Sequence, residues 1–97
     1  MASDTQAFQG KKKAASPLCS GEFHLRFEAE QNAREAARTC GAVGFSTDVR
    51  KDGTNGWLLV VVRRSQPFPL DEQDRYCGRL RGIATTHGGA FERFVQD

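Results

Sequence analysis

The sequence EFHLRFE, residues 22–28, alternates apolar and polar side chains along its whole length. A period of two places consecutive side chains on opposite faces of a β-strand, so this pattern predicts a half-buried strand. We expect its three apolar residues to face the core. His24 and Arg26 are then expected on the opposite face.

After this strand the spacing between apolar residues increases from two positions to three or four. Small apolar side chains recur three and four positions apart in residues 30–40, which predicts a short helix that packs closely on a sheet. Gly41 is expected just beyond its last turn. The small residues are Ala33, Ala36, Ala37 and Cys40.

Two strands and a turn follow the helix. Residues 44–50 alternate again, residues 51–56 contain Asp-Gly and Asn-Gly, and residues 57–62 form the apolar run WLLVVV. Asp-Gly and Asn-Gly are strong turn signals between strands. This region is therefore predicted to be a β-hairpin.

A second helix is predicted after the turn-rich connector at 63–69. Asp71 is expected as its N-cap and Gly88-Gly89 as its end. Residues 91–95 then alternate as a short final strand. The core-facing stripe of this helix is expected to contain Gln73, Cys77, Leu80, Ala84 and His87.

The predicted order is strand, helix, strand, strand, helix, strand. This order indicates an α+β, ferredoxin-like domain, in which a four-stranded antiparallel sheet carries two helices on one face. The first and third strands are expected at the centre. Residues 22–97 are assigned to this domain and residues 1–21, with the basic run 11–13, to a flexible N-terminal tail.

Composition limits the function classes. The 97 residues include 14 basic and 12 acidic side chains, a net charge of +2, which is too balanced for a dedicated nucleic-acid binder. Three cysteines without a C-x-x-C pair argue against a disulfide framework or a zinc site and fit a reducing compartment. We expect a cytoplasmic protein without membrane attachment or direct nucleic-acid contact.

Catalytic motifs are missing from the sequence. His24 and His87 are its two imidazoles, and neither belongs to a known metal or hydrolase motif. His87 is interpreted as a residue at a helix end. We therefore expect no catalytic residue, no metal site and no cofactor.

The apolar run at 57–62 predicts a binding surface. If Trp57 and every second residue after it face the helices, the others point to the open face of the sheet, although a one-residue register shift would exchange the two sets. Such an apolar face is typical of a protein interface, with either a second copy of the chain or a different protein. Val60→Glu is expected to abolish binding without unfolding the monomer. The predicted protein-binding residues are Leu58, Val60, Val62, Phe94, His24 and Arg26.

Three segments also carry a family resemblance: GAVGF at 41–45, DG with GWLLVVV between 52 and 62, and ATTHGGAFE at 84–92. With these segments the chain resembles the regulator of ribonuclease activity B family, the ribonuclease E inhibitor type, over residues 22–94. The chain departs from that family's ending at Ala90, Glu92, Arg93 and Phe94, and its N-terminal segment is basic where inhibitors of the family carry acidic tails.

The resemblance implies a ferredoxin-like domain that binds a ribonuclease and changes its activity without chemistry of its own. Two alternatives stay open: a small-ligand-sensing dimeric domain, and, less favoured, an RNA-binding domain. RNA-recognition modules of this topology stack bases on aromatic side chains of their first and third strands, and the open face expected here lacks them.

Overall fold

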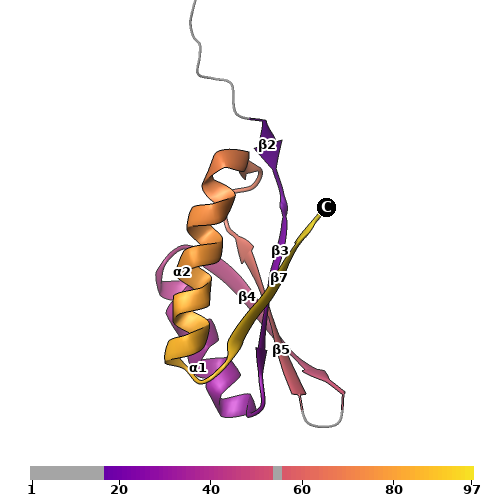
Figure 1. Cartoon of the computed structure of the whole chain (residues 1–97), viewed down its shortest axis with the longest axis vertical. Coiled ribbons are helices and arrows are strands. Elements are labelled where there is room, and N and C mark those ends of the chain that lie inside the picture. Colours follow the sequence, from indigo (N-terminus) through magenta and orange to yellow (C-terminus); the bar gives the residue numbers. More distant parts are fainter. Residues whose placement is uncertain (1–16, 54–55) are drawn as a thin grey trace, which may run out of the picture.

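The computed structural model describes residues 17–53 and 56–97, and it shows a mixed α+β domain with two helices (Figure 1). Most of the predicted tail, including the basic run at 11–13, lies outside the described residues. In chain order the elements are β2 (Leu18–Cys19), β3 (Gly21–Phe27), α1 (Glu30–Ala42), β4 (Phe45–Asp52), β5 (Gly56–Arg63), β6 (Phe68–Pro69), the 3-10 turn η1 (Leu70–Glu72), α2 (Gln73–Thr86) and β7 (Ala90–Gln96).

Four of the strands form one antiparallel sheet in the order β4-β5-β3-β7. The first and third long strands, β3 and β5, lie at its centre, as the sequence predicted. Both helices lie on the same face of this sheet (Figure 1): α1 packs on β4 and β5, and α2 packs on β7 and β3. Within residues 17–53 and 56–97, no helix lies over the other face of the sheet.

The alternation in residues 22–28 places the apolar side chains of β3 on one face, as predicted. The apolar residues of β3 are almost completely buried and face the helices, together with every second residue of β5. This register also places Trp57 on the helix side, which the sequence left open. The residue pairs are Phe23 with Val61, Leu25 with Leu59, and Phe27 with Trp57.

An aromatic cluster fills the core between the sheet and α2. Phe23 lies at its centre with no exposed surface, and its ring centroid lies 4.7 Å from that of Phe94. Edge-to-face and offset contacts of this kind add to the stabilisation from apolar burial. The other rings around Phe23 are Phe45, Phe68, Tyr76 and Phe91.

A second, two-stranded sheet corrects the predicted domain boundary. Residues 17–21 were assigned to the tail, but β2 pairs with β6, and the Leu70 amide donates to the Pro17 carbonyl at 2.8 Å. Cys19 and Phe68 are both buried by this pairing. Strands of two residues have no measurable period, so this sheet could not be predicted from alternation.

Both helices differ from the prediction at one end. α1 continues through Gly41 to Ala42, and the left-handed residue after it is Gly44, with φ of +100°. Asp71 lies within η1, and α2 begins two residues later. Gly88, with φ of +80°, follows the end of α2 as expected.

Candidate protein-binding face

The face of the sheet without helices contains most of the predicted binding residues. Leu58, Val60 and Val62 lie on this face of β5. On the neighbouring strand β3, His24 pairs with Val60 and Arg26 pairs with Leu58. Five of the six residues are therefore brought to one surface, which we call the open face.

Phe94 is the exception, and its predicted position is wrong. It lies opposite Phe23 on the helix side and packs in the aromatic cluster. The cause is a register shift in the β3–β7 pairing, where Arg93 pairs with His24 and Phe91 with Leu25, so that β7 has one extra residue there. Such a bulge turns two aromatic residues three positions apart toward the same side.

Val95 takes the place on the open face that was predicted for Phe94. It pairs with Glu22 on β3 and is 39% exposed. The spacing of Phe91 and Phe94 was a usable signal, because apolar residues three apart cannot share a face of a regular strand. The sequence reasoning interpreted the segment as regular and so missed Val95.

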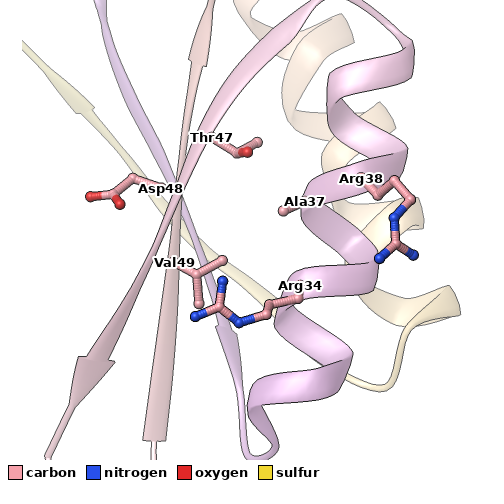
Figure 2. A pocket seen from close by; sticks show the side chains of 6 residues that line it. All are labelled: Arg34, Ala37, Arg38, Thr47, Asp48 and Val49. Atoms are coloured by element: carbon pink, nitrogen blue, oxygen red, sulfur yellow. The ribbon is translucent and has the colours of Figure 1, made fainter.

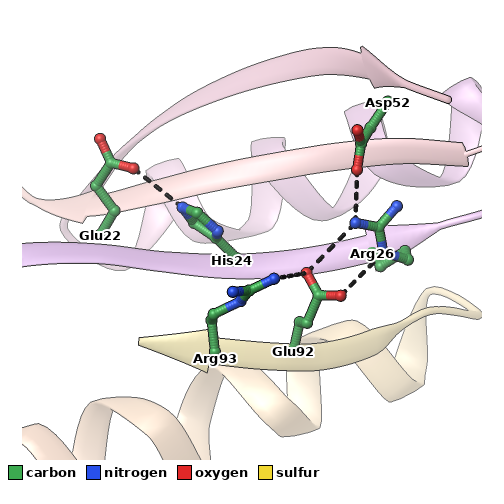
Figure 3. A network of polar contacts seen from close by, with 6 residues as sticks. All are labelled: Glu22, His24, Arg26, Asp52, Glu92 and Arg93. Atoms are coloured by element: carbon green, nitrogen blue, oxygen red, sulfur yellow. Dashed lines mark hydrogen bonds and ion pairs between the residues drawn. The ribbon is translucent and has the colours of Figure 1, made fainter. Parts of the chain in front are cut away.

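Charged side chains cross the open face and connect its strands (Figure 3). Arg26 donates from Nη2 to Asp52 Oδ2 on β4 at 2.6 Å, and from Nε to Glu92 Oε2 on β7 at 3.2 Å. These hydrogen bonds raise the pKa of Arg26 further above its usual value. One guanidinium thus joins both edge strands, and neither carboxylate was predicted as part of the site.

Gly56 allows this crossing. It lies on β5, between the strands of Arg26 and Asp52, and pairs with Asp52. A Cβ atom there would lie 3.1 Å from Arg26 Nη1 and 2.7 Å from the Asp52 carbonyl oxygen. The lack of a side chain therefore keeps the path of the arginine open across the strand.

Two further polar pairs border the open face. His24 Nε2 lies 3.0 Å from Glu22 Oε1 (Figure 3), and Arg50 Nε donates to Asp48 Oδ2 at 2.6 Å on the edge strand β4. The Arg50–Asp48 pair is exposed, and exposed ion pairs contribute little to stability. The effect of both pairs here is to hold charged groups in set positions around the apolar residues of β5.

The apolar part of the open face is consequently narrow. Val60 is 5% exposed although no helix of the described residues covers it, and it pairs with Asp48 on one side and His24 on the other. Leu58 and Val62 remain partly exposed. We therefore expect Val60→Glu to destabilise the fold, because it would bury a carboxylate next to Asp48, and this replaces the expectation from sequence.

A hollow on the other side of the sheet lies between α1 and β4 (Figure 2). It measures about 450 Å³, and the small side chain of Ala37 leaves this space open. Arg34 extends from α1 toward Val49, and Asp48 points away from the helix. Arg34 already forms an ion pair with Glu30 at 2.7 Å.

The three cysteines are free thiols. Cys19 and Cys40 are buried, and Cys77 is partly exposed. Burial raises the pKa of Cys40 to about 11, and it also raises the pKa of Cys77, with a smaller contribution from Asp74. A thiol that stays protonated is a poor nucleophile, so Cys40 acts as a small apolar core residue.

This shift of the Cys40 pKa predicts a loss of stability at alkaline pH. Below about pH 9 the thiol is protonated in both folded and unfolded chains, and between pH 9 and 11 ionisation favours the unfolded chain. The contribution of this residue is expected to fall by roughly 2 kcal/mol over that window. Urea unfolding at a series of pH values measures this fall in the free energy of unfolding. The free energy of unfolding of Cys40→Ala should depend less on pH between 9 and 11. Equal slopes for the wild type and Cys40→Ala would contradict the prediction.

His87 connects the two helices. Its Nε2 lies 3.0 Å from Thr39 Oγ1 and so joins the end of α2 to α1. Among the described residues, no group of three or more histidine, cysteine or acidic side chains is placed to hold a metal ion. Neither helix in the described ranges is long and apolar enough to cross a membrane.

Comparison with known proteins adds no relative. No family model matches the chain, and neither curated proteins nor solved structures give a match.

Proposed function

We propose that this chain is a non-catalytic regulatory domain of the ferredoxin-like type, which binds a protein partner through the open face. The observation that carries the proposal is the exposure of Leu58 and Val62 on a central strand, on the face without helices. A sheet that packs helices on one side leaves its other face to water or to a partner. Because Leu58 and Val62 are apolar, contact with a partner is more favourable for this face than contact with water.

The charges around these residues support a specific contact. Specific interfaces combine an apolar centre with a polar rim. Here Leu58 pairs with Arg50 on one side and Arg26 on the other, and Arg26 is held by two carboxylates. A partner with an apolar side chain at the centre and polar groups around it would fit this surface.

The family resemblance suggests a ribonuclease as the partner, and a cytoplasmic location agrees with the free thiols. Direct stacking of RNA bases is less favoured, because Trp57 and Phe94 both pack on the helix side. The proposed domain would change the ribonuclease's activity by occupying part of its surface.

Replacing the exposed apolar residues is expected to abolish binding without unfolding the domain. Leu58→Asp places a carboxylate between Arg26 and Arg50, and Val62→Lys places an ammonium near Glu22, so both changes have favourable neighbours in the free domain. We expect each to weaken partner binding about tenfold or more, with a melting temperature close to that of the wild type. Binding to a purified ribonuclease E-type enzyme and its cleavage rate are the measurements.

Leu70→Asp is the matched control, since Leu70 is 38% exposed but lies in η1, outside the open face. It should bind like the wild type. Sedimentation of the same variants distinguishes a second copy of the chain from a different protein, because a homodimer would dissociate on Leu58→Asp. If wild type and variants neither dimerise nor alter the ribonuclease, the proposed function is wrong.

A further inference from the structure

A small pocket lined by three arginines lies on the helix side of the sheet, away from the open face. It measures about 190 Å³ and opens where β4 begins, β5 ends and the first turns of α2 pass over them. This is smaller than the roughly 300–1,000 Å³ typical of drug-sized ligands, so its occupant would be compact. The lining residues are Val43, Phe45, Arg63, Arg75, Tyr76 and Arg79.

Two hydrogen bonds hold Arg63 in this pocket. Its Nε donates to the Tyr76 hydroxyl at 3.1 Å, and its Nη1 donates to the Gly44 carbonyl at 3.0 Å. Its guanidinium carbon lies 5.5 Å from the centre of the Tyr76 ring and 6.0 Å from that of Phe45. Within residues 17–53 and 56–97, Nη2 has no hydrogen bond and the group has no carboxylate partner.

The other two arginines come from α2. Arg75 and Arg79 are four positions apart, which places them on the same side of a helix, next to Tyr76. Arg75 is 68% exposed and has a single distant carboxylate, Glu72 Oε2 at 4.0 Å. Arg79 forms no hydrogen bond or ion pair in the part of the chain that the structure describes.

The Glu72 carboxylate beside Arg75 already accepts a hydrogen bond. Glu72 accepts a short hydrogen bond from the Tyr76 hydroxyl, which directs that oxygen toward the tyrosine. None of the described residues that line the pocket is acidic. Three guanidinium groups therefore converge with less negative charge than they can neutralise, and such a cluster favours an anion.

We propose that this pocket binds the phosphate group of a small phosphate monoester. A phosphomonoester has a charge of about −2 near neutral pH and three acceptor oxygens, which suit three guanidiniums better than a single carboxylate does. Val43, which is 39% exposed, and the partly exposed ring of Tyr76 supply an apolar wall for the body of the molecule. This site does not depend on the proposed protein-binding function of the open face.

Titration of the isotopically labelled full-length chain tests the site. The probes are inorganic phosphate, phenyl phosphate and, as a monoanion control, acetate, all at constant ionic strength. Both phosphates should cause saturable shifts of the Arg63 side-chain and Gly44 amide NMR signals, and acetate should cause none. Tighter binding of phenyl phosphate supports a monoester, whereas equal binding would overturn the monoester and leave free phosphate as the ligand.

Two matched variants on α2 distinguish binding at this pocket from nonspecific attraction of phosphate to the positive charges of the helix. Arg79→Gln is expected to weaken phosphate binding about tenfold, since it removes a charge-assisted contact from an exposed position. Arg81→Gln is the control, because Arg81 lies over the Phe91 ring at 5.3 Å and does not line the pocket. Equal effects of the two variants, saturable binding of acetate, or no saturable phosphate shifts would overturn the proposal.

Discussion

Phe23→Ala is expected to remove most of the free energy of unfolding of this domain. The side chain has no exposed surface and touches five other aromatic rings, so truncation leaves a large cavity at the centre of the core. Phenylalanine-to-alanine changes in cores cost about 3–5 kcal/mol. Small domains have total stabilities of about 5–15 kcal/mol, with domains of this size near the lower limit.

Urea unfolding followed by circular dichroism measures this loss. Phe23→Leu keeps most of the buried apolar volume and should be much milder, which separates cavity formation from disturbance of β3. Val95→Ala, at a partly exposed position on the open face, should change the midpoint little. An unfolding midpoint of Phe23→Ala close to that of Val95→Ala would show that the aromatic cluster does not carry the core.

Gly89→Ala is expected to destabilise the domain by about 3 kcal/mol, which is a large effect for one methyl group. A Cβ atom at this position would lie 2.4 Å from two carbon atoms of the Phe27 ring and 2.5 Å from the Arg26 carbonyl oxygen. Because Phe27 is fully packed, the start of β7 would have to move away from β3. Thermal unfolding of the variant gives the loss directly.

Gly78→Ala is a control of opposite sign. Gly78 lies inside α2, where a Cβ atom would meet nothing within 4 Å. Alanine is a better helix former than glycine, so this change should stabilise the domain by about 0.5–1 kcal/mol. If both substitutions shift the melting temperature in the same direction, close packing at Gly89 is not the cause.

The Gly89 contact also gives a physical role to the segment that carries the family resemblance. His87 contacts Thr39, Gly88 has a positive φ, and Gly89 leaves space for Phe27. All three residues together turn the chain from α2 into β7. In this protein the His-Gly-Gly segment therefore has a role in the fold.

Much of the fold followed from the period of apolar residues. The alternation at 22–28 predicted a strand with a buried face, and the spacing at 30–40 predicted the helix that covers it. These patterns are local, because side-chain direction repeats every two residues in a strand and about every 3.6 in a helix. They also placed Leu58, Val60 and Val62 on one face with His24 and Arg26.

Other features depend on which segments become neighbours. The position of Phe94 follows from the bulge in β7, and the structure of Leu18–Cys19 follows from pairing with Phe68–Pro69, about 50 residues away in sequence. The pattern of apolar residues within one strand does not show which strand will pair with it or in which register. The exposure of Val60 likewise depends on side chains from the flanking strands.

The sequence by itself determined the class of domain and the strand that supplies the apolar residues of the open face, because alternation is set by backbone geometry within one segment. Only the tertiary structure decided how much of that strand stays accessible, since Arg26, Asp52 and Glu92 meet across four strands. It also brought Arg63 together with Arg75 and Arg79 from separate elements. Contacts between distant segments are set by packing, which a local pattern does not encode.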